Sequence, residues 1–527
     1  MKKITYTPLV AWLLLLGSNN SSAQKTDTIA VRFSKYLTAD GMKKNLTVLA
    51  SDEYEGRETG QKGQKMAAEY ITKYYKDLGI PPLKDLKEGY QQTYPLAVFN
   101  PPELKLNINK KTYTQAKDYF SWANITGDTD IIISDIEFFG YGINTQVYND
   151  YDKADVKNKA VMILSGEPYG KDGKSIISQT VETSPWATNH RAKIAEAKKQ
   201  GIKYLLVVDT NIALSYAQQE RRLKHNRMAL DDGSSTDYPL VIYISRQMAD
   251  EILSSSTKYQ IAGIMSQVSG TAKPVRFSTK TNIELNLKQG KQKVSAENVM
   301  AYLEGTDLKN ELIVISGHYD HLGIQDDRVY NGADDDGSGT VAVMQLAKAF
   351  MEAKKQGKGP RRSILFLDVS GEEKGLLGSE YYTEHPVFEL SKTICDLNID
   401  MIGRIDDAHN GNPNYIYLIG SDKLSSSLHQ ISEQANKTYT NLKLDYTYND
   451  EKDPNRFYYR SDHYNFAKNN VPVIFYFNGV HADYHEPTDD VEKIDFNKME
   501  KISRLVFFTA WKLVNQTERI KVDSSKK

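Results

Sequence analysis

The stretch ELIVISGHYDHLG (residues 311–323) joins an apolar run to a turn that carries histidine and aspartate. The run Glu311–Ser316 is short and strongly apolar, which predicts a buried strand of a mainly parallel sheet. A second stretch, SILFLDVSGEEKG (363–375), repeats the pattern, with Glu372 and Glu373 after its apolar run. Both stretches therefore place polar side chains just beyond the carboxyl end of a predicted strand.

The sequence around these stretches alternates further apolar runs with helical patterns. Over residues 341–350, apolar side chains recur every three positions between flanking glycines, which indicates a helix. Short apolar runs at 393–399, 415–419 and 472–477 predict three more strands, and 496–514 predicts a last helix. The alternation predicts an α/β fold, a three-layer sandwich whose middle layer is a mixed, mainly parallel sheet.

The length of the chain, 527 residues, is too great for one hydrophobic core and predicts at least two domains. Short apolar runs separated by polar loops fill residues 128–290, which predicts a β-rich insert. Residues 24–127 and 291–519 would then form one domain split by the insert. Residues 520–527 form a polar tail.

The first 23 residues predict a signal peptide. Lys2 and Lys3 precede the apolar run Leu9–Leu16, and small polar residues follow it. This run is far shorter than the ~20 residues that cross a membrane, so we expect export without stable membrane insertion. A periplasmic or secreted protein is therefore expected.

The composition excludes some classes of function. The 67 basic and 68 acidic residues nearly cancel, so the chain has no electrostatic footprint for nucleic acid. The single cysteine, Cys395, cannot form an intrachain disulfide. It lies within a predicted apolar strand, which favours a place in the core over a role in a site.

Residues with metal-binding side chains collect after the predicted strands. They are His318, Asp320, Asp334 to Asp336, Glu372, Glu373, Asp400, His463, His481 and His485. Imidazoles and carboxylates without a thiol suit Zn²⁺ in a catalytic site. Two ions ~3.5–4 Å apart would need one shared carboxylate and about two further ligands each, which leaves one glutamate as a general base.

Six motifs carry a resemblance to a known family. They are SGHYDHLG (316–323), NGADDDGSGT (331–340), SGEEKGLLGS (370–379), NIDM (398–401), RSDHYNF (460–466) and YHEPTDD (484–490). The set resembles the di-zinc exopeptidases of the MH clan, the family of bacterial leucyl aminopeptidases and glutamate carboxypeptidase II. The resemblance implies a zinc-peptidase/phosphorylase-like fold, and the position of the insert resembles that of a protease-associated domain.

The resemblance also implies two Zn²⁺ per chain and a ligand set. His318 and Asp400 would bind one zinc ion, Glu373 and His485 would bind the other, and Asp335 would bridge both. Spacing alone does not separate His485 from the other C-terminal histidines.

Further roles are implied for neighbouring residues. Glu372 would be the general base that activates a metal-bridging water, and Asp320 would orient His318. Tyr484 is expected to stabilise the oxyanion, with Arg460 and His463 on the substrate side. We expect His321 to pack or cap, and Arg57 to be a structural salt-bridge partner.

The implied function is an exported aminopeptidase that removes N-terminal residues from peptides. A carboxypeptidase or dipeptidase of the same family is an alternative. Others are a single-zinc acyltransferase of the glutaminyl-cyclase type, which should lack ligands on one side, and a non-catalytic receptor-like relative, which should lack ligands or the base. All the expected positions are filled, which favours the peptidase.

Overall fold

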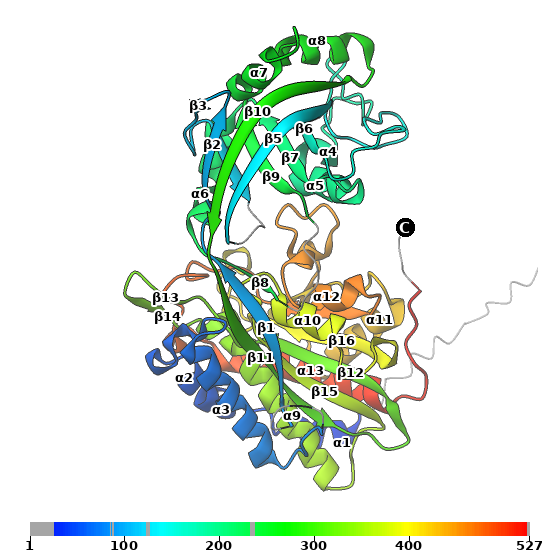
Figure 1. The fold of residues 1–527 in the computed structure, drawn as a ribbon. Coiled ribbons are helices and arrows are strands. Elements are labelled where there is room, and N and C mark those ends of the chain that lie inside the picture. Colours follow the sequence, from blue (N-terminus) through cyan, green and yellow to red (C-terminus); the bar gives the residue numbers. More distant parts are fainter. Residues whose placement is uncertain (1–25, 85, 87–88, 123–126, 232–237, 524–527) are drawn as a thin grey trace, which may run out of the picture.

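A computed structural model describes residues 26–523, except for 85, 87–88, 123–126 and 232–237. The predicted signal peptide (1–23) and residues 524–527 of the polar tail lie outside the described residues. The described chain folds into two large sheets, each covered by helices and joined by long strands (Figure 1). Among the described residues, no helix is long and apolar enough to cross a membrane.

The first sheet has nine strands and a parallel centre. In spatial order they are β18 (Lys443–Asp445), β17 (Tyr415–Ile419), β19 (Val473–Phe477), β16 (Thr393–Ile399), β12 (Leu308–His318), β15 (Arg362–Val369), β11 (Lys291–Leu303), β1 (Gln91–Phe99) and β8 (Arg227–Leu230). Strands β19, β16, β12 and β15 are parallel neighbours, whereas β11, β1 and β8 continue the sheet antiparallel. The strands predicted at 311–316, 363–369, 393–399, 415–419 and 472–477 are β12, β15, β16, β17 and β19.

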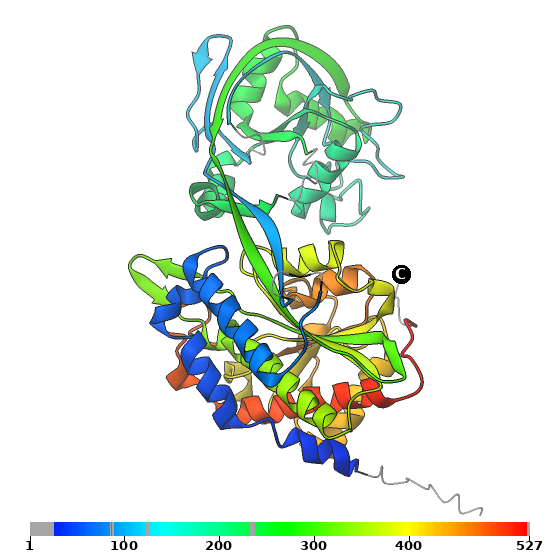
Figure 2. The ribbon, with the colours of Figure 1, turned by 60° about the horizontal axis from the view of Figure 1, so that its bottom comes forward.

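Helices cover both faces of this sheet (Figure 2). One face packs against α1 (Thr28–Ser34), α2 (Ala39–Leu49), α3 (Lys62–Leu78), α9 (Gly339–Lys355), α11 (Ser426–Ala435) and α13 (Phe496–Asn515). The other face packs against α10 (Leu377–Glu384) and α12 (His463–Lys468).

The alternation of side chains along β12 explains why two helical layers are needed. Ile313 and Ile315 belong to the core on the α9 and α13 side, while Leu312 and Val314 belong to the opposite core. All four side chains are buried, so each face of the strand needs an apolar layer. The predicted three-layer α/β fold is confirmed, and Cys395 of β16 lies in its core.

The second sheet has eight strands. In spatial order they are β3 (Lys111–Thr112), β2 (Glu103–Ile108), β10 (Arg276–Gln289), β5 (Gly127–Phe139), β6 (Ala160–Leu164), β7 (Tyr204–Asp209), β9 (Leu240–Ser245) and β4 (Tyr119–Trp122). Its helices are α4 (Pro185–Thr188), α5 (His190–Lys199), α6 (Ile212–Lys224), α7 (Arg246–Ser254) and α8 (Ile261–Thr271). The cores on its two faces contain residues of α7 and α8, and of α5 and α6 respectively.

The two sheets share a continuous connection. Strand β10 of the second sheet runs into β11 of the first, and only Gly290 separates them. Strand β1 pairs antiparallel with β11 as far as Phe99 and Lys291, and the N–H of Asn100 donates to the carbonyl of Gly290 (3.0 Å). Strand β8 returns to pair with β1. The long β10 and β11 do not appear among the predicted strands, because polar residues interrupt their apolar pattern.

Candidate metal centre

The ligand-type residues meet at the carboxyl ends of the central strands. His318 is the last residue of β12, and Asp400 directly follows β16. Asp335 lies in the turn Ala333–Ser338 that leads into α9, and Glu373 lies in the loop after β15. His485 lies in the loop after β19. Four connections at one sheet edge thus bring together residues that are far apart in sequence, as open α/β sheets do at their binding sites.

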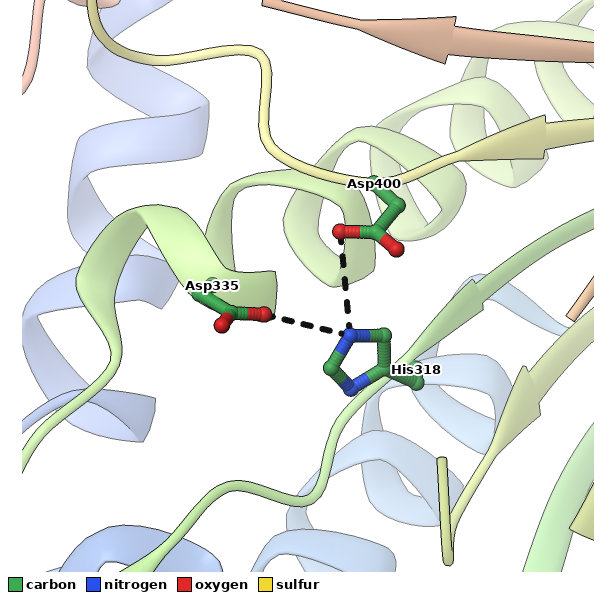
Figure 3. Close-up of side chains that lie close together, drawn as sticks. All are labelled: His318, Asp335 and Asp400. Atoms are coloured by element: carbon green, nitrogen blue, oxygen red, sulfur yellow. Dashed lines mark ion pairs between the residues drawn. The ribbon is translucent and has the colours of Figure 1, made fainter. Parts of the chain in front are cut away.

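Three of these residues form a first buried group (Figure 3). The Nε2 atom of His318 lies 3.3 Å from Oδ1 of Asp335 and 3.7 Å from Oδ1 of Asp400. Figure 3 shows both carboxylates directed at the same imidazole nitrogen. One ligand atom from each residue lies within 4.8 Å of the others, a spacing that fits a single ion.

A second group lies on the other side of Asp335. The Nε2 atom of His485 lies 3.0 Å from Oδ2 of Asp335 and 3.2 Å from Oε2 of Glu373. Asp335 therefore directs one oxygen to each group. This is the arrangement that a bridging carboxylate between two metal ions requires.

His321 also belongs to the second group, which differs from our expectation that it packs or caps. Its Nδ1 lies 2.9 Å from Oε1 of Glu373 and 3.9 Å from Oδ2 of Asp335, and its ring is fully buried. The sequence contained a signal for this position. His321 is three residues after His318, in the same polar turn at the end of β12.

The carboxylates of Asp334, Asp336 and Asp489 fix the turn that carries Asp335. Oδ2 of Asp489 accepts hydrogen bonds from the backbone N–H groups of Asp334 (2.9 Å) and Asp335 (3.1 Å). Asp336 accepts from the N–H groups of Gly339 (2.8 Å) and Met401 (3.0 Å). Of the three consecutive aspartates, only Asp335 is free to face both groups.

His481 supports the same turn. Its Nε2 lies 3.1 Å from Oδ2 of Asp334, whose Oδ1 accepts a hydrogen bond from the N–H of Gly403 (2.6 Å). His481, one of the residues with metal-binding side chains, therefore lies behind the site rather than in either ligand group.

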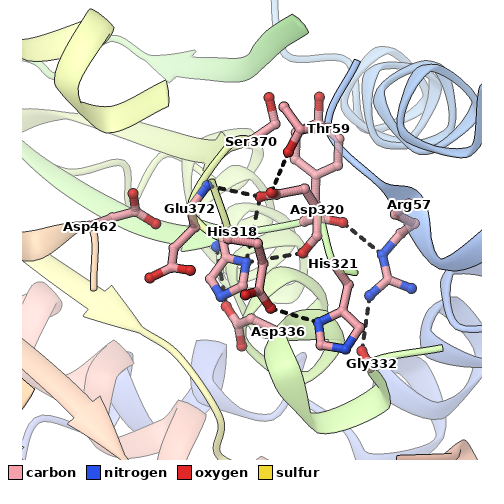
Figure 4. Close-up of polar contacts among 12 residues, drawn as sticks. Arg57, Thr59, His318, Asp320, His321, Gly332, Asp336, Ser370, Glu372 and Asp462 are labelled. Atoms are coloured by element: carbon pink, nitrogen blue, oxygen red, sulfur yellow. Dashed lines mark hydrogen bonds and ion pairs between the residues drawn. The ribbon is translucent and has the colours of Figure 1, made fainter. Parts of the chain in front are cut away.

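Asp320 links His318 to the loop of Glu372 (Figure 4). Its backbone carbonyl lies 3.1 Å from Nδ1 of His318, and its carboxylate Oδ1 lies 3.6 Å from the same nitrogen. Oδ1 also accepts a hydrogen bond from the backbone N–H of Glu372 (3.2 Å). Asp320 is thus suited to fix the position of the His318 imidazole relative to the loop that carries Glu372.

Burial and neighbouring acids act on the carboxyl group of Glu372. Burial raises its pKa well above the ordinary value, and the nearby charges of Glu373, Asp462 and Asp400 raise it further. Glu372 lines a pocket together with His318, Asp335, Asp400 and His485. A half-buried carboxyl group with a raised pKa is suited to accept and return a proton.

The remaining walls of this pocket are mainly apolar. Met401, Phe457, Phe475 and Phe477 line it. Such a wall excludes water and favours an apolar side chain of a bound molecule.

Two of the three expected substrate-side residues also line the pocket. Tyr484 stacks on the imidazole of His485 with ring centroids 3.9 Å apart. Nη2 of Arg460 donates to the hydroxyl of Tyr484 (3.2 Å), and its guanidinium lies 4.8 Å from the ring centroid of Phe457. His463 is not brought to the pocket. It is fully buried at the start of α12 against Phe475, and burial lowers its pKa to about 3.

Arg57 holds the loops around the site, but not through the salt bridge that we expected. Its guanidinium donates to four backbone carbonyls, those of Tyr319 (2.7 Å), Leu49 (2.7 Å), Asn331 (2.7 Å) and Gly332 (2.9 Å). Figure 4 shows Arg57 beside Gly332 and His321. The side chain therefore ties α2 and both ligand-bearing loops together.

The donor set fits divalent zinc. Oδ2 of Asp335, Oε1 of Glu373 and both ring nitrogens of His321 are buried and make no hydrogen bond with the described residues. Burial and the neighbouring Asp335 act to raise the pKa of Glu373, but contacts with His321 and His485 lower it to about 2. The carboxylate of Glu373 therefore remains ionised and favours a bound cation. Nitrogen and oxygen donors without sulfur are typical of catalytic zinc sites.

Proteins with aminopeptidase names are similar to this chain. A protein of Arthroderma otae named probable leucine aminopeptidase is 27% identical over 257 residues, 47% of this chain and 65% of the relative. One of Aspergillus oryzae named probable leucine aminopeptidase 2 is 30% identical over 204 residues, 38% of this chain and 37% of the relative. The chain thus spans less than two thirds of the length of these curated relatives.

A solved aminopeptidase from Aneurinibacillus sp. strain AM-1 has the same fold, with a TM-score of 0.52 and 17% identity over 94% of this chain and 98% of that chain. The model of Peptidase family M28 matches residues 298–510. This segment contains every member of both ligand groups. Residues 298–510, which carry the candidate metal centre, are thus similar to Peptidase family M28.

Proposed function

We propose that the protein is an exported aminopeptidase that uses two zinc ions. The observation that carries the proposal is the position of Asp335. It directs one carboxylate oxygen to a His318 and Asp400 group and the other to a His485 and Glu373 group. The match to Peptidase family M28 and the names of the relatives support the same activity.

In this proposal the two groups hold the two ions. His318 and Asp400 bind one, Glu373 and His485 bind the other, and Asp335 binds both. When bound, two Zn²⁺ supply a Lewis acid at the scissile carbonyl and lower the pKa of water.

The chain itself supplies the proton transfers. Glu372 lines the pocket beside both groups and takes the proton of the attacking water, then returns it to the leaving amine. Asp320 orients His318 and holds the Glu372 loop. The hydroxyl of Tyr484 would stabilise the developing oxyanion, and Arg460, which donates to that hydroxyl, would hold it from the substrate side.

We also propose a division of the chain. Residues 1–23 are the signal peptide, and the M28 domain is split by an insert. The observed pairing favours an insert somewhat longer than 128–290, because β2, β3 and β4 already belong to the eight-stranded sheet. The partners are peptides, and the apolar pocket favours an apolar N-terminal residue.

The test combines metal analysis with hydrolysis. The purified protein should contain about two zinc ions per chain and should release the first residue of peptides with a free N-terminus. Blocking the N-terminal amine should abolish hydrolysis. Preferential hydrolysis at the C-terminus would instead identify a carboxypeptidase, one zinc ion would favour the cyclase-type enzyme, and none the receptor-like relative.

A variant tests the mechanism directly. Glu372→Gln should reduce kcat by roughly 10³-fold or more, because the general base is removed, while the zinc content remains at two ions. Glu389→Gln is the matched control, because it makes the same chemical change at an exposed position that does not line the pocket. Unchanged hydrolysis by Glu372→Gln would overturn the mechanism.

A further inference from the structure

His321 occupies a fixed place beside the second ligand group. It follows β12 by three residues, and its backbone N–H donates to the carbonyl of Arg57 (3.3 Å). The ring packs against Gly332, where an added Cβ would lie 2.4 Å from Cγ of the imidazole. Gly332 also has φ +53°, so this close approach depends on glycine. The backbone therefore holds the imidazole in one position.

The polar contacts of this ring are few for a fully buried imidazole. The side chain is fully buried, and neither Nδ1 nor Nε2 has a hydrogen bond with the described residues. Nδ1 nonetheless lies 2.9 Å from Oε1 of Glu373. An unsatisfied buried polar group costs about 1–3 kcal/mol, so such groups in folded proteins usually have a partner such as an ion or water.

The distances around Nδ1 match those between donors of one ion. Zinc ligands lie roughly 2.0–2.2 Å from the metal, which places two donors of one ion roughly 3–4 Å apart. Nδ1 of His321 lies 2.9 Å and 3.9 Å from the nearest oxygens of Glu373 and Asp335. Nε2 of His485 lies 3.2 Å and 3.0 Å from oxygens of the same two carboxylates.

We propose that His321 is a ligand, through Nδ1, of the ion that Glu373 and His485 bind. The inference rests on the proposed two-zinc site and adds a fourth protein donor to one half of it. The two halves are then unequal. One has four protein donors (His321, Asp335, Glu373 and His485), and the other has three (His318, Asp335 and Asp400).

This asymmetry has a measurable consequence. A zinc ion with four protein ligands has a closed site, whereas three protein ligands leave a position open. The ion at Glu373 and His485 should therefore leave the protein more slowly when a chelator is added. Release of zinc from the native protein should show two phases of different rate.

The first experiment measures zinc binding to the metal-free protein by calorimetric titration. His321→Ala should lower the zinc affinity of one of the two binding events by about tenfold to 100-fold, the range that the loss of a metal-site partner usually causes. The other event should stay unchanged. His429→Ala is the matched control, because His429 lies on α11, contacts Ser421 and does not line the site pocket.

The second experiment counts imidazoles by X-ray absorption of the zinc-loaded protein. The native protein should show three imidazoles for two zinc ions, and His321→Gln should show two. The glutamine variant retains an amide that can hydrogen-bond to Glu373, so it separates ligation from mere orientation of that carboxylate.

The outcomes distinguish the two proposals. Two zinc ions with only two imidazoles in the native protein, or unchanged zinc affinity in His321→Ala, would overturn the role of His321 and leave the proposed function intact. A native protein that binds no zinc would overturn the proposed function as well.

Discussion

The hydroxyl of Thr59 donates a 2.6 Å hydrogen bond to Oδ2 of Asp320, although 261 positions separate the two residues. Both side chains are fully buried. The other carboxylate oxygen of Asp320 faces His318 and the N–H of Glu372. The segment before α3 thus reaches the candidate metal centre through one carboxylate.

Replacing Thr59 tests whether this bond positions the site. Thr59→Val preserves the shape but removes the donor, which should lower stability by about 1–3 kcal/mol and kcat by roughly tenfold. The pH profile of kcat/KM should shift, because Asp320 then interacts differently with His318. Thr59→Ser should restore both. A stability loss with an unchanged kcat and pH profile would mean that Thr59 serves the fold alone.

Arg57 should be essential for the arrangement of the ligand loops. Arg57→Met leaves four buried carbonyls without their donor, so we expect a loss of about 3–5 kcal/mol in urea unfolding. Zinc content should fall with it. The exposed Arg246→Met, which removes a surface ion pair with Asp250, should change stability by less than about 1 kcal/mol. Equal effects of the two substitutions would refute this role of Arg57.

Tyr484 should act on kcat more than on KM. Burial raises the pKa of its phenol well above the ordinary value, so the hydroxyl remains a donor at any ordinary pH. Tyr484→Phe should reduce kcat by roughly 10²-fold and leave KM nearly unchanged, as removal of an oxyanion donor does. Tyr459→Phe is the matched control, because Tyr459 is 45% exposed and does not line the pocket. An effect on KM alone would assign Tyr484 to substrate binding.

Asp368 should make stability depend on pH. Burial raises its pKa to about 8, although the hydroxyl of Tyr75 donates a hydrogen bond to it. In the unfolded chain this pKa is about 3.9. The folded state therefore binds one proton more between these values, and the free energy of unfolding should fall as pH rises from about 4 to about 8.

Asp368→Asn should remove that part of the pH dependence, on the order of 3–5 kcal/mol. The measurement is the difference in unfolding free energy between the native protein and the variant across about pH 5 to 8. Asp307→Asn should show no such slope, because its hydrogen bond with Arg361 lowers the pKa of Asp307 to about 2. Parallel curves for the native protein and Asp368→Asn would contradict the assignment.

The central strands of the first sheet could be predicted because continuous apolar runs mark them in the sequence. The apolar runs of β12 and β15 are continuous because both faces of each strand are buried, and polar residues follow at the sheet edge. Because ligand-type residues follow the predicted strands, the sequence predicted that His318 and Asp335 lie close together at one edge of the sheet. Strand β10 escaped prediction because its buried and exposed residues alternate. Strand β11 escaped it because its first residues are exposed and polar, and its buried part contains Glu297 and Asn298.

The contacts of individual side chains could not be predicted from the sequence where their partners lie far away along the chain. Arg57 finds its carbonyls in loops 262 to 275 positions away, apart from that of Leu49. No local pattern specifies those partners. His321 lies in the polar turn after β12, but only the approach of Glu373 and Asp335 in the fold shows that its Nδ1 faces the second group. Pairing of β8 with β1 likewise joins segments that no periodicity connects.

The pairing of Phe99 with Lys291 has a consequence for how separable the two halves are. If residues 101–289 were deleted, Asn100 would be joined directly to Gly290, and Asn-Gly is the dipeptide that type I′ hairpin turns favour. The second sheet could thus be excised at a natural hairpin, with β1 and β11 still in register. Strand β8 would leave with it, so the shortened protein would expose Leu96–Phe99 as a new sheet edge and should tend to self-associate there.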